Sequence, residues 1–115
     1  QASKMITLVN NEKLLNIMME DETSAGNMVS VNFLNSYMTY RPDIEAKDFD
    51  ICPVLLTQPE KDRWTPLNLS KPTLDQITKV PVTIEILPNG GHYPVEPEAL
   101  TVMNQTITQF ITDLL

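Results

Sequence analysis

Two short apolar segments, separated by enough chain to form a helix, constrain the fold of this sequence most strongly. Residues 51–57 carry three consecutive aliphatic side chains, as is typical of a central strand covered on both faces in a parallel sheet. Residues 80–87 alternate apolar and polar side chains, and Pro81 removes a backbone donor near their start, so an edge strand is expected. The connection at 66–78 is long enough for the crossover helix that parallel strands need. The sequence therefore predicts a β-α-β unit.

Apolar side chains at three- and four-residue spacing predict helices on both sides of this unit. The last helix runs from Pro97, which suits the first turn, to Leu114. In the connection, Pro72 is expected to break or begin the helix. Two earlier patterns comprise Met5, Leu8, Leu15 and Met18, and then Met28, Val31, Leu34 and Met38, with Gly26 near the start of the second. The predicted fold class is α/β: half of a doubly wound sheet with two parallel strands, preceded by two or three helices.

The chain divides near residues 40–50, where Pro42 and alternating charges interrupt the apolar pattern. We expect a helical segment over residues 1–48 and an α/β core over residues 49–115. Neither part contains an internal repeat or a low-complexity tract. The chemistry is therefore expected in the core, at the ends of its strands.

The composition argues against several classes of partner. Fifteen acidic and eight basic side chains leave a net charge of −7, which repels nucleic acid. The longest apolar runs fall far below the roughly 18 residues of a membrane-spanning helix. Cys52 is the single cysteine and is expected to be a buried, inert thiol, which fits a reducing, cytoplasmic location. One cysteine and one histidine form no metal constellation, and no glycine-rich loop predicts a cofactor.

Two polar loops follow the predicted strands directly. The first reads TQPEKDRWTP over residues 57–66, and the second reads NGGHYPVE over residues 89–96. The first resembles the α/β-hydrolase loop G-x-x-D-x-x-x-P that presents the triad acid, and the second resembles the Gly-His loop that presents the triad histidine. The order of acid and histidine also matches that family. The resemblance covers residues 50–115, with Pro59 where the family usually has glycine.

The resemblance implies that Asp62 is the acid and His92 the general base, with Pro66 and Gly91 at supporting positions. It further implies that residues 1–48 form the family's cap. A histidine, with an ordinary pKa of about 6.5, suits proton transfer, and the carboxylate would hold its tautomer. The alternatives are a loop histidine that caps the following helix and a turn aspartate in a charged cluster.

The sequence lacks the Gly-x-Ser-x-Gly elbow that such a hydrolase needs, because none of its five serines is flanked by glycines. No loop that would supply oxyanion donors is present either. We therefore expect the chain to be the C-terminal part of a serine-type hydrolase and to be inactive alone. The full protein, with an upstream serine, is expected to act on an ester or lipid-like substrate. Peptidases, dehalogenases, lactonases and some lyases share this scaffold. The alternative is a non-catalytic module that binds an apolar ligand or a protein.

The candidate substrate contacts are Trp64, Phe33, Tyr37 and Met38. The last three belong to a stretch rich in methionine and aromatic residues, which either forms an adaptable lid or, more commonly, ordinary packing. Trp64 follows the acid and either faces the cleft or packs under the cap.

In a chain that is only the C-terminal part of the hydrolase, the strand at 51–57 would lack the neighbouring strand from the upstream part. One edge of this strand is therefore expected to be exposed. An unpaired apolar strand edge recruits another chain. We therefore expect a homo-oligomer, or pairing with the missing N-terminal half through this strand.

Overall fold

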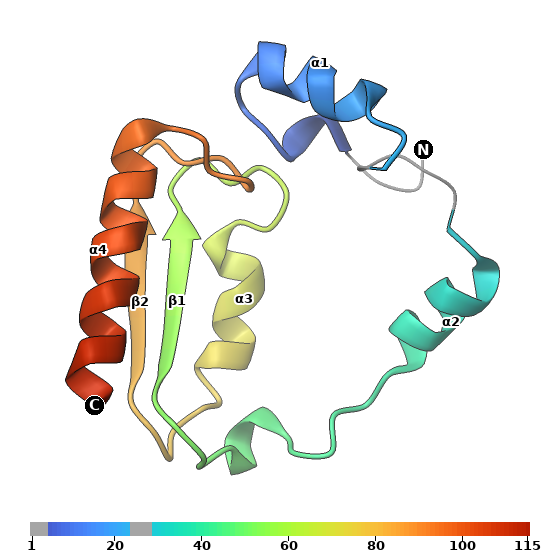
Figure 1. Ribbon diagram of the computed structural model, residues 1–115. Helices are drawn as coiled ribbons and strands as arrows, with labels where there is room; N and C mark the ends of the chain where they lie inside the picture. Colours follow the sequence, from blue (N-terminus) through green and yellow to red (C-terminus); the bar gives the residue numbers. More distant parts are fainter. Residues whose placement is uncertain (1–4, 24–28) are drawn as a thin grey trace.

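The computed structural model describes residues 5–23 and 29–115 of the chain. Its helices and strands, shown in Figure 1, are η1 (Met5–Thr7), α1 (Glu12–Glu20), α2 (Val31–Thr39), η2 (Ala46–Asp48), β1 (Val54–Pro59), α3 (Leu67–Leu74), β2 (Val82–Leu87) and α4 (Pro97–Leu114).

The two strands form a parallel sheet, with Val54 opposite Val82 and Pro59 opposite Leu87. The helix α3 lies in the connection between them, so the predicted β-α-β unit is confirmed. Both strands begin later than predicted, and the backbone N–H of Val54 makes the first bond across the sheet, to the carbonyl of Pro81. In the described residues β1 has one neighbour rather than two, so it lies at an edge, not at the centre.

The helix α4 agrees with its predicted range and packs against both strands. Its first residue is Pro97, and Ala99 in its first turn is fully buried. The helix α3 contains Pro72 in its interior, so the prediction that this proline breaks or begins the helix was wrong. A proline leaves one carbonyl of the preceding turn without a donor, and α3 ends two residues later.

The first predicted helical pattern is only partly correct. Leu15 and Met18 lie in α1, but Met5 lies in the short helix η1 and Leu8 in the bend after it. The side chain of Asn11 accepts a hydrogen bond from the N–H of Leu14, which fixes the start of α1 after these residues.

The second predicted pattern coincides with α2, which carries Val31, Leu34 and Met38. Ser30 caps this helix by accepting a bond from the N–H of Phe33. The other residues singled out there, Gly26 and Met28, lie outside the described residues.

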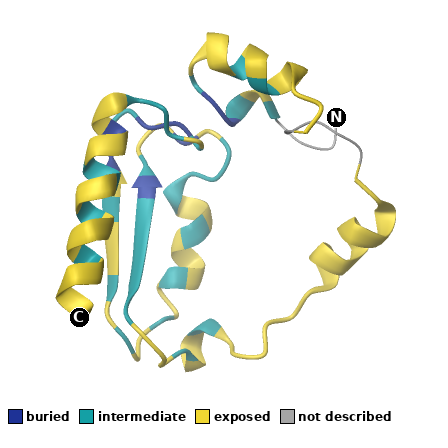
Figure 2. Cartoon of the chain, in the orientation of Figure 1, coloured by how far each residue is buried: buried dark blue, intermediate teal, exposed yellow. Residues whose placement is uncertain are grey.

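Few side chains are buried, as Figure 2 shows. The buried apolar residues within the described ranges are Leu8, Val9, Leu87 and Ala99. Every residue of α2 is exposed, and the chain from this helix to β1 is exposed along most of its length. Cys52 is exposed too, so the expected buried thiol was wrong: the residue precedes Pro53 and stands outside the strand. Among the helices of the described residues, none has the length and apolar character needed to span a bilayer.

Candidate functional site

The parallel register brings the two polar loops to one edge of the sheet. Because Pro59 and Leu87 are paired at the strand ends, both loops leave the sheet at the same level. Backbone bonds continue beyond the strands: the N–H of Glu60 donates to the carbonyl of Leu87, and that of Lys61 to Gly90. The loop after β1 is thereby held beside the loop after β2.

Asp62 and His92 meet across these loops. His92 Nδ1 lies 3.0 Å from Asp62 Oδ2. The Asp62 side chain is 3% exposed and the His92 side chain 25% exposed. The proximity expected from the sequence is therefore confirmed, and the carboxylate is buried behind an imidazole that solvent reaches.

The carboxylate of Asp62 accepts further hydrogen bonds from its own loop. The backbone N–H groups of Trp64 and Thr65 each donate to Oδ1 at 2.8 Å. The hydroxyl of Thr65 donates to Oδ2 at 3.1 Å. Burial raises the pKa of Asp62, but the hydrogen bonds from the His92 side chain and from the backbone N–H groups of Thr65 and Trp64, with the attraction of His92, together lower it below its ordinary value. Asp62 is therefore ionised at neutral pH.

The hydrogen bond to Asp62 determines which nitrogen of His92 carries the proton. An ionised carboxylate only accepts, so Nδ1 must donate, and in the neutral imidazole Nε2 is the nitrogen with the free lone pair. Two aromatic rings flank the imidazole: the Trp64 ring centre lies 6.1 Å away and that of Tyr93 lies 5.1 Å away. The arrangement presents Nε2 as a base beside aromatic surfaces.

A polar cluster ties the ends of the two loops together. Asn89, in the turn that follows β2, has a φ of 56°, a left-handed conformation that asparagine tolerates better than most residues. Its backbone N–H donates to Glu60 at 2.8 Å, and its side chain accepts from Lys61 and donates to Glu98 on α4. These contacts position the acid loop against the histidine loop.

The segment from Leu8 to Asn10, which the sequence did not connect with the site, contacts both loops. The Leu8 carbonyl accepts from the N–H of Tyr93 at 2.8 Å. The Asn10 side chain donates to the carbonyl of Lys61 at 3.1 Å and accepts from Arg63 Nε at 2.9 Å. A methyl group added at Gly91 would lie 3.0 Å from the Asn10 side chain, so glycine permits this close approach.

The candidate substrate contacts separate into two groups. Trp64 lies at the Asp62–His92 pair. Phe33, Tyr37 and Met38 are exposed on α2, and the structure does not bring them to the pair (Figure 1). Substrate contact by these three residues remains a prediction.

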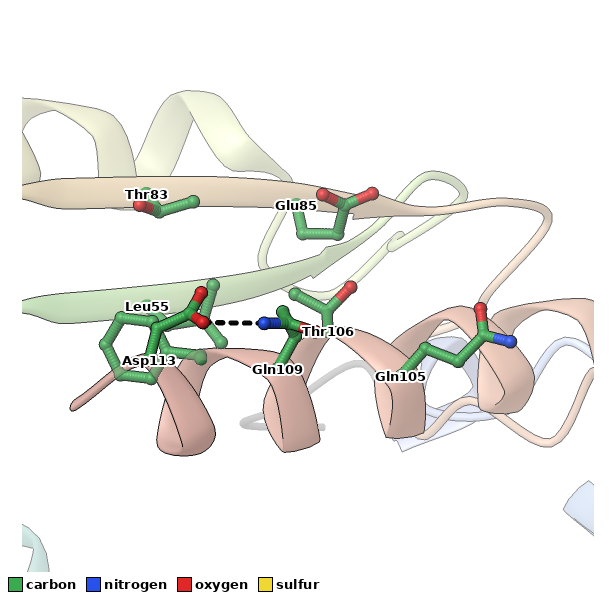
Figure 3. A pocket seen from close by; sticks show the side chains of 8 residues that line it. Leu55, Thr83, Glu85, Gln105, Thr106, Gln109 and Asp113 are labelled. Atoms are coloured by element: carbon green, nitrogen blue, oxygen red, sulfur yellow. Dashed lines mark hydrogen bonds between the residues drawn. The ribbon is translucent and has the colours of Figure 1, made fainter. Parts of the chain in front are cut away.

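Two hollows adjoin the sheet. A pocket of about 250 Å³ beside Asp62 and His92 is also lined by Thr65, Ser70 and Met103. A groove of about 450 Å³ opens between one part of the sheet and α4, where Thr83 and Glu85 of β2 face Gln109 and Asp113 (Figure 3). Gln109 donates to Asp113 there. Of these two hollows, the first contains the Asp62–His92 pair and the second does not.

Comparisons of the sequence with family models and with curated proteins, and of the structure with solved structures, return no match. Within the residues that the structure describes, no three His, Cys, Asp or Glu side chains gather so that they could hold a metal ion. The functional interpretation therefore depends on the geometry of the two loops.

Proposed function

We propose that this chain is the C-terminal part of a serine-type α/β-hydrolase, with Asp62 as the triad acid and His92 as the general base. The observation that carries the proposal is the 3.0 Å hydrogen bond between a buried, ionised carboxylate and a partly exposed imidazole. The two residues project from the carboxyl ends of adjacent parallel strands, where open α/β sheets hold their sites. Acid precedes histidine along the chain, as in this family.

The proposed substrates are carboxylic esters, including lipid-like ones. His92 Nε2 takes the proton of a serine hydroxyl as its oxygen attacks the ester carbonyl carbon, and then returns that proton to the departing alkoxide. Asp62 stays ionised, keeps the proton on Nδ1 and stabilises the imidazolium. Water then releases the acyl group through the same proton transfers.

The serine and the oxyanion donors are proposed to come from an upstream part of the full polypeptide. Among the described residues, Ser30 caps α2, Ser36 lies on α2 and Ser70 lies in α3. None of these three serines hydrogen-bonds to His92. The isolated chain is therefore expected to be inactive. A cytoplasmic location and residues 1–48 as the cap belong to the same proposal.

A panel of acyl esters of increasing chain length, assayed with the polypeptide encoded by the whole reading frame, tests the proposed activity. We expect turnover of at least one ester, and a Gly-x-Ser-x-Gly elbow in the sequence before residue 1. Activity on another bond without turnover of any ester would contradict the substrate class. Absence of an elbow would contradict the serine mechanism.

The second candidate function is a non-catalytic module that binds an apolar ligand or a protein. The observation in its favour is α2, on which Phe33, Tyr37 and Met38 are 58%, 73% and 74% exposed. A native start close to residue 1 would favour this candidate, because no upstream serine could then complete the pair.

A further inference from the structure

Thr65 contacts both members of the pair at once. Its Oγ1 lies 3.1 Å from Asp62 Oδ2 and 3.1 Å from His92 Nδ1, while these two atoms are 3.0 Å apart. Three polar atoms from two loops thus form a nearly equilateral triangle.

The chemistry of the three groups fixes the direction of each hydrogen bond in this triangle. His92 Nδ1 donates to Asp62, because the ionised carboxylate only accepts. Nδ1 therefore has no free lone pair, so the hydroxyl proton of Thr65 must point to Asp62 Oδ2. The oxygen lone pairs of Thr65 then face the imidazole N–H. Both neighbours of Oδ2 donate to it, which satisfies this oxygen in its buried position.

The backbone around Thr65 holds its hydroxyl at this place. Its own N–H donates to Asp62 Oδ1 at 2.8 Å, and its carbonyl accepts from Gln58 Nε2 at 3.4 Å. Gln58 is 4% exposed, and Pro66, which follows Thr65, begins the turn into α3. Gln58 and the start of α3 thus restrain the residue from both sides.

On the basis of the proposed function, we infer that Thr65 is a positioning residue. Its hydroxyl keeps the Asp62 carboxylate and the His92 imidazole in the relative orientation that proton transfer needs. The other charged side chains beside the carboxylate point elsewhere: Lys61 bonds to Asn89 and Arg63 bonds to Asn10. The hydroxyl of Thr65 is thus the neutral group that contacts both acid and base, donating to Asp62 and presenting its lone pairs to His92. The lowered pKa of Asp62 agrees with a carboxylate surrounded by donors.

The test compares T65V, which removes the hydroxyl at nearly constant volume, with T65S, which keeps it. In the 115-residue chain, carboxyl ¹³C NMR follows the Asp62 titration, assigned by the signal that D62N lacks. We expect T65V to raise the Asp62 pKa and T65S to leave it close to the wild-type value. T83V, on the α4 side of β2 and away from the site, is the control and is expected to change nothing.

A kinetic measurement on the full polypeptide separates positioning from a merely structural role. We expect T65V to lower kcat for an ester at least about tenfold, the factor for one hydrogen bond to a charged group, with little change in KM and recovery in T65S. An unchanged Asp62 pKa in folded T65V, or T65S as impaired as T65V, would overturn the inference. If T65V does not fold, T65A, which also lacks the hydroxyl, is titrated in its place, and an Asp62 pKa equal to that of wild type overturns the inference. A polypeptide without hydrolytic activity but with the expected titrations contradicts the proposed function alone.

Discussion

At the scale of single residues, the burial of Asp62 is compensated by donors from three directions. His92, the Thr65 hydroxyl and two backbone N–H groups satisfy the oxygens of a side chain that is 3% exposed. A buried carboxylate without such partners would be protonated or would destabilise the fold. The acid site is therefore also a stability site, and its effect depends on pH.

The lowered pKa of Asp62 predicts a loss of stability in acid. Because the folded-state pKa lies below the ordinary value of 3.8, the stabilising contribution is complete above pH 3.8 and is lost as the pH falls through the lower folded value. In urea unfolding at neutral pH, D62N is expected to be less stable than wild type, and this difference should shrink towards pH 3. The control D50N changes an exposed carboxylate and should follow wild type. A D62N deficit that stays constant with pH would contradict the prediction.

Asp62 and His92 could be predicted because each follows a strand directly and each occurs within a recognisable pattern. Thr65 could not, because a threonine before a proline in a loop carries no signal for a contact with a histidine 27 positions later. Asn10 lies 51 positions before the residue whose carbonyl it binds, and no local pattern marks it. The expected burial of Cys52 was wrong because the strand predicted over residues 51–57 begins only at Val54, which leaves Cys52 outside it.

At the scale of elements, the helical pattern of Met5 and Leu8 was misleading, because long-range contacts determine where these residues lie. Leu8 is buried against the loops, and its carbonyl pairs with Tyr93. The strands and α4 were predictable, since burial against one face imposes their periodicity. The segment from Leu8 to Asn10 joins the N-terminal part of the chain to the site.

Removing the Asn10 side chain is expected to loosen this segment. N10A loses the bonds to Lys61 and Arg63, a cost of about 1–2 kcal/mol for local opening. The amide of Tyr93, which donates to Leu8, should then exchange its hydrogen about tenfold faster. The control N16A alters an exposed asparagine of α1 and should leave this exchange rate unchanged. Equal Tyr93 exchange in N10A and wild type would show that Asn10 does not hold the segment.

At the scale of the whole molecule, the chain exposes more surface than a compact protein of its size. Its accessible surface is 8635 Å², whereas about 6,300 Å² is expected from its mass. Its radius of gyration is 16.5 Å, whereas about 13 Å is expected from its length. The difference in area is comparable to one side of a large protein interface. We therefore predict that the chain associates with another copy of itself or with the upstream part of the proposed full polypeptide.

The free edge of β1 gives a specific test of self-association. The N–H of Val54 points to β2, so by alternation the N–H groups of Leu55 and Thr57 point to the free edge. Pro59 also faces this edge but has no N–H group. T57P removes one of these two donors without affecting the β1–β2 bonds. We expect self-association of the wild type at micromolar concentration by light scattering, and about tenfold weaker association of T57P.

T57V keeps the backbone donor and is the matched control, with association expected to equal that of the wild type. A wild-type chain that remains monomeric at micromolar concentration and melts cooperatively would contradict pairing through this edge.

The roles of Asp62 and His92 are tested by ester hydrolysis with the full polypeptide carrying H92Q or D62N, with D50N as the control. We predict that H92Q abolishes turnover, that D62N lowers kcat by about 10⁴-fold, and that D50N leaves turnover at the wild-type level. Turnover by H92Q near that of wild type would contradict these roles, because the only imidazole that Asp62 contacts would then play no part in the reaction.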